Sequence, residues 1–172
     1  LGEQAFNRTV SFTGKYIANF RAPNQEDGNG VVSDWEVALA QVDEQSAILV
    51  VRGLWSERLL NPEIQQSMNI DIEGVLVASQ FADRADNVPG IISRLDSAVV
   101  VGLTDLDLYD GYIQARAESV RGAELERSRI TEEKINPKIP GYYWQHISYV
   151  VIWWLMAAVV LYLPFYRRRV TP

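Results

Sequence analysis

The sequence contains no cysteine and a single histidine, His146, among its 172 residues. Without cysteine, the chain has neither a disulfide framework nor a thiolate metal site. It also lacks a Walker loop, a G-x-S-x-G motif and a dinucleotide-binding fingerprint. A Ser–His–acid triad would have to use His146, which borders a long apolar run. The sequence therefore predicts a protein that is not an enzyme and has no catalytic residues.

Positive charge is scarce in the first 140 residues. They hold 13 of the 16 Lys and Arg but all 22 Asp and Glu, which gives a net charge of −9. Because phosphate groups are bound by basic faces, we do not expect a nucleic-acid partner. The acidic stretch TDLDLYDG, with Asp105, Asp107 and Asp110, lacks the glycine and the terminal glutamate of a calcium-binding EF-hand loop. We interpret it as a solvated acidic turn.

Only one long run is free of charge. Residues 147–166 (ISYVVIWWLMAAVVLYLPFY) would form a helix about 30 Å long, the thickness of the hydrocarbon core of a bilayer. Apolar residues occupy the whole circumference of this helix, which favours a lipid-exposed span over a core helix. Aromatic residues at both ends suit the two membrane interfaces. They are Tyr142, Tyr143, Trp144 and Tyr149 at the start, and Tyr162, Phe165 and Tyr166 at the finish.

Three arginines, Arg167, Arg168 and Arg169, follow the apolar run and predict its direction by the positive-inside rule. We expect a cell-membrane protein with residues 1–140 as an extracytoplasmic domain, 141–166 as a transmembrane helix with its interfacial lead-in, and 167–172 as a cytoplasmic basic tail. In a mitochondrial membrane the domain would lie in the intermembrane space. The chain begins with Leu1 rather than Met, and we expect a second, N-terminal span outside it.

Alternating or β-branched patterns predict strands in the extracytoplasmic domain. The run AILVVRGLW (47–55) is almost continuously apolar, which is typical of a central strand buried on both faces. A short hairpin loop is expected over residues 43–46. The other predicted strands cover residues 8–16, 32–42, 69–79, 91–101 and 111–117. Five or six strands with short connections predict a mainly β (α+β) fold, either an antiparallel sheet or a small barrel.

Other segments lack this alternation. Residues 22–30 are rich in turn formers and predict an exposed loop, and Gly14 predicts a bulge or kink. Short helical stretches are expected over residues 62–68 and 103–109. The highly charged residues 118–138 predict a solvated segment leading to the membrane, partly helical over 122–129.

His146 stands one position before the apolar run, and Tyr149 and Trp153 follow at i+3 and i+7. These spacings place the three side chains on one face of a helix. An imidazole at the membrane surface with aromatic neighbours is able to ligate haem iron. The same residues also suit an ordinary aromatic belt at the interface, which the residues alone favour. Both interpretations stay open at this point.

The segment QHISYVVIWWLMA resembles the second transmembrane segment of the Surfeit locus protein one family, whose pattern is roughly H-x-x-Y-A-x-x-W. His146, Tyr149 and Trp153 match this pattern, and Val150 replaces the alanine. Four earlier segments also resemble family elements, in the family's order, over about residues 7–165. They are RTVSFTGKY (Arg8, Val10, Gly14, Tyr16), LVVRGLW (Leu49, Val50, Arg52, Gly53), IEGVLVAS (Gly74) and LYDGYIQ (Tyr109, Gly111, Tyr112). In LVVRGLW the tryptophan, Trp55, comes one place later than in the family. The double tryptophan of the span is most similar to bacterial members, actinobacterial ones in particular.

The resemblance implies two spans flanking an extracytoplasmic β-rich domain and a non-catalytic role in the biogenesis of haem–copper cytochrome oxidases. It further implies that His146 ligates the iron of haem a, with Tyr149 and Trp153 lining the same face. The implied partners are oxidase or respiratory supercomplex subunits and membrane lipid. One alternative is a permanent accessory subunit of the oxidase or supercomplex, whose acidic domain docks a basic electron carrier such as cytochrome c. Another is an extracytoplasmic sensor or lipid-binding module.

Overall fold

A computed structural model describes residues 6–60, 69–81, 88–132 and 141–168. The chain divides into two compact units, residues 1–134 and 135–172, which are described separately below. The helix expected over residues 62–68 lies outside the described residues.

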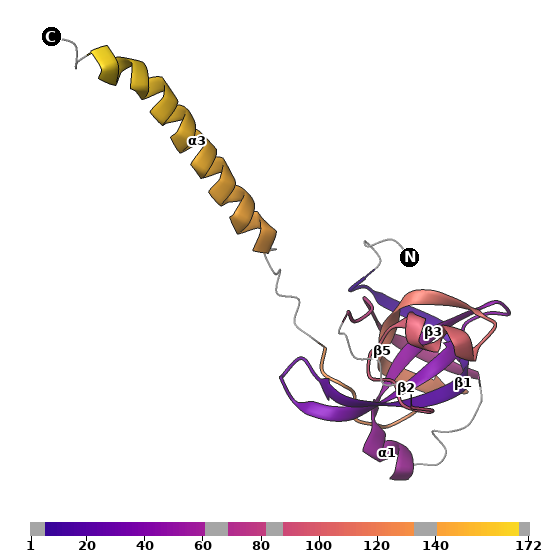
Figure 1. Cartoon of the computed structure of the whole chain (residues 1–172). Coiled ribbons are helices and arrows are strands. Elements are labelled where there is room, and N and C mark those ends of the chain that lie inside the picture. The colour runs from indigo at the N-terminus through magenta and orange to yellow at the C-terminus, as the bar shows by residue number, and fades with distance from the viewer. Residues whose placement is uncertain (1–5, 61–68, 82–87, 133–140, 169–172) are drawn as a thin grey trace. The chain divides into compact units, whose positions relative to one another are not determined.

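The first unit is built on five long strands, β1 (Thr9–Glu26), β2 (Val32–Gln41), β3 (Ser46–Leu54), β4 (Asn69–Val77) and β5 (Asp107–Val120). β1 pairs antiparallel with β4 through its first part and with β2 through its second part. β2 pairs with β3 and β4 pairs with β5, also antiparallel, and a parallel pairing of β3 with β5 closes the circle. The order β1-β2-β3-β5-β4-β1 is that of a five-stranded Greek-key barrel of the OB type, and Figure 1 shows these strands curling around one another. The predicted mainly β fold is therefore confirmed, and of the two predicted forms, an antiparallel sheet or a small barrel, the closed circle of pairings is that of a barrel.

The barrel interior holds apolar side chains from all five strands. Tyr16 comes from β1, Ile72 from β4 and Ile113 from β5, and each is almost fully buried. The other buried members of this cluster are Ala38, Ala40, Ile48, Val50, Ile70, Leu76 and Ala115. Alternate residues of β2 and β3 belong to this interior, so their other faces need separate cover.

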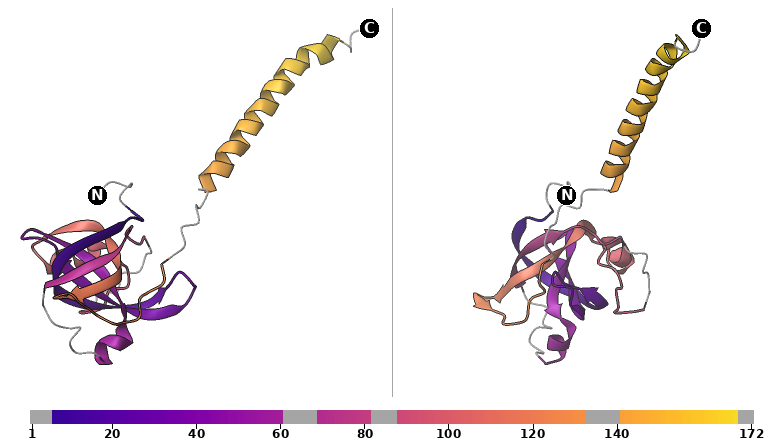
Figure 2. Two further views of the ribbon diagram at one scale, coloured as in Figure 1. Left: turned by 180° about the vertical axis from the view of Figure 1, so that it is seen from behind. Right: turned by 90° about the vertical axis from the view of Figure 1, so that its left-hand side faces the viewer.

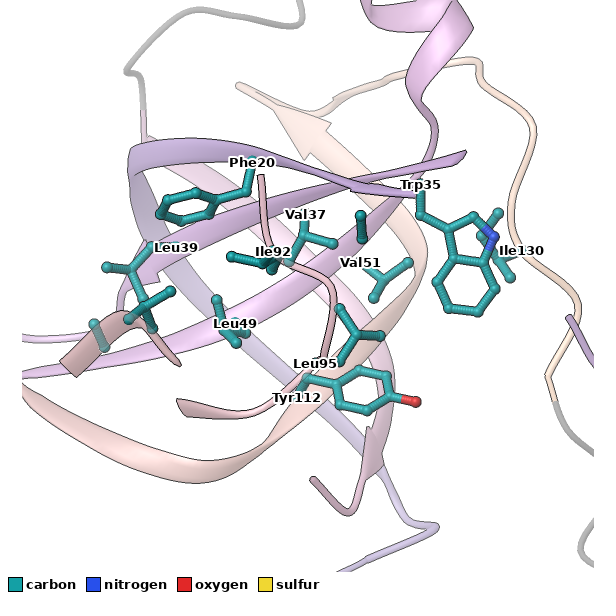
Figure 3. Packing of buried hydrophobic residues seen from close by; sticks show 13 residues of the cluster. Phe20, Trp35, Val37, Leu39, Leu49, Val51, Ile92, Leu95, Tyr112 and Ile130 are labelled. Carbon is teal, nitrogen blue, oxygen red and sulfur yellow. The ribbon is translucent and has the colours of Figure 1, made fainter. Parts of the chain in front are cut away.

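The second face of the β2–β3 half of the barrel is covered by the connection between β4 and β5. Figure 3 shows Ile92 and Leu95 of this connection packed over Val37, Leu49 and Val51. Both faces of β3 are thus buried, as its continuous apolar run predicts.

The strand predicted over residues 91–101 is wrong. The segment contains the short helix α2 (Ser97–Val100), followed by the 3₁₀ turn η3 (Val101–Leu103). Asp96 caps α2 by accepting a hydrogen bond from the Ala98 amide, 3.0 Å away. The cap and the burial of Val100 override the β propensity of the valines. The helical turn expected over residues 103–109 is also misplaced, because β5 already begins at Asp107.

Two predictions about β1 also need correction. Residues 22–30 were expected as an exposed loop, but β1 continues to Glu26 and buries Ala22 and Gln25. The register of β1 is regular at Gly14 and shifts instead between Tyr16 and Ala18 and between Ala22 and Gln25. Gly14 marks the place where β1 changes partner, and a Cβ there would lie only 2.7 Å from the Gln41 carbonyl oxygen.

The charged segment after β5 is the largest departure from expectation. β5 runs on to Val120 and forms a small hairpin with β6 (Ala123–Glu124) instead of a helix over 122–129. Ile130 is buried against Trp35, in the same cluster as Ile92 and Leu95 on the outer face of β2 and β3 (Figure 3). The predicted solvated segment is thus part of the folded barrel as far as residue 132.

The second unit contains one long helix, α3 (Gly141–Arg168), with Pro164 near its end. Residues 144–164 of α3 are long and apolar enough to cross a membrane, with a mean hydropathy of 2.0, and none of that window is buried within the chain. Figure 2 shows α3 as one continuous helix from two sides. The expected C-terminal helix of membrane-spanning length is therefore present.

Candidate functional site

The three residues predicted to hold haem all lie in the first half of α3. Helical geometry puts His146, Tyr149 and Trp153 on one stripe of this helix. Tyr149 is 54% exposed and Trp153 is 72% exposed, and His146 is exposed as well. The stripe is therefore an uncovered surface of imidazole and aromatic rings, a suitable face for either a flat macrocycle or another helix. Within the described ranges, no group of three or more His, Cys, Asp or Glu residues is arranged to hold a metal ion.

A second candidate site, which the sequence analysis did not predict, is a buried ion cluster in the barrel. Its centre is Arg52 of β3, only 1% exposed, between two fully buried carboxylates, Glu36 of β2 and Glu118 of β5. The Arg52 Nε donates to Glu118 at 2.8 Å, and its Nη1 donates to Glu36 at 3.3 Å. The guanidinium also stacks over the Tyr16 ring, 4.1 Å from its centre. The Tyr16 hydroxyl donates to the same Glu118 carboxylate.

The segment after β6 supplies two further cations to this cluster. We call residues 125–132 the strap. Arg127 donates to Glu36 at 2.8 Å, and Arg129 donates to Glu118 at 3.1 Å and to the Arg52 carbonyl oxygen at 3.0 Å. The side chain of Arg127 is fully buried. The strap is thus fixed to three strands of the barrel by charge-assisted hydrogen bonds.

Further hydrogen bonds extend the same attachment along the strap. The Ser128 amide donates to the Glu57 carboxylate of α1 (Trp55–Leu60) at 3.0 Å. Gln114 of β5 donates to the Ile130 carbonyl oxygen at 2.9 Å, and the Gly28 amide donates to the Thr131 carbonyl oxygen at 2.9 Å. Almost every residue from 127 to 131 therefore has a partner in the barrel. The folded barrel unit therefore extends along the chain to residue 132, the last described residue before α3.

Gly53 makes the close approach of the strap possible. Its backbone has a φ of +150°, and a Cβ at this position would lie 2.5 Å from the Ser128 carbonyl oxygen and 3.1 Å from the Arg127 Nε. No other residue type has room at this position. Both residues of the Arg-Gly pair in LVVRGLW therefore serve the attachment of the strap. Arg52 supplies the central charge of the cluster, and Gly53 leaves room for the strap backbone.

The electrostatics of the cluster keep the Glu118 carboxylate ionised. Burial acts to raise the pKa of Glu118, but the charges of Arg52 and Arg129 and the hydrogen bonds from Arg52 and Tyr16 outweigh it and lower the pKa below the ordinary value. Burial raises the pKa of the Tyr16 hydroxyl well above its ordinary value, and the neighbouring Glu118 charge raises it further. Glu118 is consequently a charged acceptor and Tyr16 a neutral donor. Such a cluster fixes a conformation, and neither Glu118 nor Tyr16 is tuned for proton transfer near neutral pH.

The lowered pKa of Glu118 predicts a specific loss of stability in acid. A group with a depressed pKa in the folded state stabilises the fold above its unfolded-state pKa, and this stabilisation disappears as the pH falls through the folded-state value. We therefore expect the denaturant concentration at the unfolding midpoint to decrease as the pH falls below the ordinary pKa range of glutamate. In Glu118→Gln this decrease with pH should be shallower. Denaturation curves measured between neutral and strongly acidic pH test this, and equal slopes for the two proteins would contradict it.

A signal for this cluster is nevertheless present in the sequence. Arg52 stands inside the apolar run of β3, and Glu36 stands inside WEVALA of β2. A charge surrounded by apolar strand residues is seldom buried without a partner. Opposite charges in two neighbouring strands therefore predict their own pairing, whereas the partners Glu118, Arg127 and Arg129 lie in a charged stretch where no pattern distinguishes them.

The acidic stretch near residue 105 is placed as expected for a solvent-facing segment. Asp105, Asp107 and Asp110 are exposed, and Asp110 accepts a hydrogen bond from the Ser79 hydroxyl at 2.8 Å.

Comparison with known proteins gives one match. A family model described as the SURF1 family matches residues 2–158, which includes the whole barrel and most of α3. No curated protein and no solved structure matches the chain.

Proposed function

Because the chain belongs to the SURF1 family, we propose that it is a membrane-anchored, non-catalytic factor for the biogenesis or association of a haem–copper cytochrome oxidase. The family is known for cytochrome oxidase assembly, and its members are assembly factors rather than catalysts. The observation that carries the proposal is the match over both the barrel and α3. The buried cluster supports a structural role for the barrel, since its charged groups are occupied with one another.

The proposed topology places residues 1–140 outside the cytoplasm, 141–166 in the cell membrane and 167–172 in the cytoplasm. Its support is the uncharged window of α3, followed at once by Arg167, Arg168 and Arg169. A reporter that is active only in the cytoplasm is expected to be active when fused after Pro172. Protease added to intact spheroplasts is expected to cleave the chain within residues 1–140. An inactive reporter together with a protected barrel would contradict this orientation.

The finer proposal is that His146 ligates haem a while Tyr149 and Trp153 line the same face of α3. Its support is the single histidine of the chain, which shares a stripe of α3 with the exposed rings of Tyr149 and Trp153. We expect the full chain in detergent to bind haem a with a shifted Soret band, and His146→Ala to lose that shift. Ser148→Ala is the matched control, because Ser148 lies on the opposite side of α3 and bonds only to the Trp144 and Gln145 carbonyl oxygens. Identical Soret spectra for wild type and His146→Ala would remove His146 from the site.

A permanent accessory subunit is the second candidate. Trp144, Trp153 and Trp154 are 64%, 72% and 75% exposed, and large uncovered rings around a helix suit lasting contacts with other transmembrane helices. Stoichiometry separates the two candidates. A permanent subunit stays at one copy per purified oxidase through detergent washing, whereas an assembly factor is present on only a small fraction of mature complexes.

A further inference from the structure

One turn of the barrel presents two uncovered aliphatic side chains on a rigid support. Val101 and Leu103 of η3 are 61% and 66% exposed, while Val100 immediately before them is fully buried in the core. A Cβ at Gly102 between them would meet nothing within 4 Å. The turn is held from beneath by the core and by the Asp96 cap of α2. Val101 and Leu103 therefore offer a small exposed apolar contact on a supported turn.

Carboxylates lie beside this turn from two parts of the chain. Asp105 and Asp107 follow η3 after Thr104, and the Asp107 amide donates to the Gln45 carbonyl oxygen at 2.7 Å, so that the turn between β2 and β3 lies alongside the start of β5. That turn contributes the exposed Asp43 and Glu44. We call these four carboxylates together with Val101 and Leu103 the η3 surface.

The charge of the η3 surface is largely uncompensated. Among the described residues, no Lys or Arg forms an ion pair with Asp43, Glu44, Asp105 or Asp107. Lys15 is the one described cation that shares a shallow depression with Asp43 and Glu44. The η3 surface therefore stays strongly negative.

The charge at Asp43 is also fixed in place. Its carboxylate accepts hydrogen bonds from the Gln45 amide at 2.9 Å, from the Ser46 amide at 2.7 Å and from the Ser46 hydroxyl at 3.0 Å. These bonds, the one from Gln45 first, lower the pKa of Asp43. A rigid charge beside rigid apolar groups loses little conformational freedom when a partner binds.

We propose that the η3 surface docks a basic protein, one that presents lysine or arginine around an apolar contact. The arrangement matches the usual anatomy of an interface, an apolar centre with a polar rim, and the net charge of −9 on residues 1–140 would steer a cation toward it. Anionic lipid and nucleic acid carry the same sign of charge as the rim and are disfavoured. The proposal stands independently of the oxidase assignment.

Binding of cytochrome c, a small lysine-rich protein, to the full chain in detergent micelles tests the charge of the η3 surface. Wild type is expected to bind saturably and to weaken as salt rises, and Asp105→Asn/Asp107→Asn is expected to bind about tenfold more weakly at low salt. The matched control is Glu124→Gln/Glu126→Gln, which removes two exposed charges at the other end of β5 and is expected to have little effect. Absence of saturable binding, or equal losses in the two charge variants, would overturn the proposal.

The apolar centre needs its own variant. Val101→Ser/Leu103→Ser is expected to weaken binding about fivefold at low and at moderate salt, because the lost contact is not electrostatic. Its melting curve should match that of wild type, since both side chains are already exposed. Unchanged affinity in this variant, or occupation of the η3 surface by a second copy of the chain instead of cytochrome c, would show that the surface serves another purpose.

Discussion

Glu118→Gln is expected to destabilise the barrel by about 3–5 kcal/mol, because removing one partner of a buried charge cluster leaves its other charges uncompensated. Glu118 is fully buried and accepts from Arg52, Arg129 and Tyr16. Glutamine keeps the shape and one acceptor but removes the charge. Since a whole domain is stable by only about 5–15 kcal/mol, a loss of this size shifts the unfolding midpoint far.

Chemical denaturation of the full chain in detergent, followed by circular dichroism of the strands, measures this effect. Glu124→Gln is the matched control, because Glu124 is exposed in β6, only a few residues along the chain. Its midpoint should stay close to that of wild type. A Glu118→Gln midpoint as high as that of Glu124→Gln would mean that the cluster does not hold the barrel together.

Gly53→Ala is the second large effect, expected on the order of 3 kcal/mol, because the backbone is strained for any residue with a Cβ and the strap occupies the space. The added methyl would stand 2.5 Å from the Ser128 carbonyl oxygen, closer than real contacts allow. The least costly response is for the strap to move away, which would break the hydrogen bonds that Arg129 makes to the Arg52 carbonyl oxygen and to Glu118.

Hydrogen exchange distinguishes release of the strap from general unfolding. In Gly53→Ala the amides of residues 125–132 should exchange faster than in wild type, while the amides of β2 keep most of their protection. Gly102→Ala is the matched control, because a Cβ at Gly102 would meet nothing within 4 Å and its φ lies outside the left-handed region. Unaltered exchange in the strap of Gly53→Ala would contradict the tight approach at this glycine.

The α3 stripe can be predicted from the sequence, whereas the buried ion cluster as a whole cannot. The α3 stripe depends only on helical spacing, which a sequence fixes directly, so His146, Tyr149 and Trp153 fall on one face as predicted. The buried cluster depends on side chains up to 102 positions apart, as in the Tyr16–Glu118 hydrogen bond. Spacing along the chain carries no information about such pairs, which is why the charged stretch 118–138 on its own predicts a solvated segment.

The fold shows the same division. Local patterns predicted β2, β3 and β4 almost to their ends, because alternation and β-branched runs reflect the two faces of a strand. The valine-rich residues 97–101 were misassigned because the Asp96 cap and the packing of Val100 outweigh propensity. Closure of the barrel by the parallel β3–β5 pairing is a long-range event that no local pattern indicates.

The most direct test of the proposed role is to isolate the tagged full chain from detergent-solubilised membranes and to identify by mass spectrometry what is retained with it. The account predicts that haem–copper oxidase subunits are enriched with wild type and are lost when α3 is replaced by an unrelated apolar helix of equal length. Recovery of the chain without oxidase subunits, under conditions that keep the oxidase intact, would contradict the respiratory assignment.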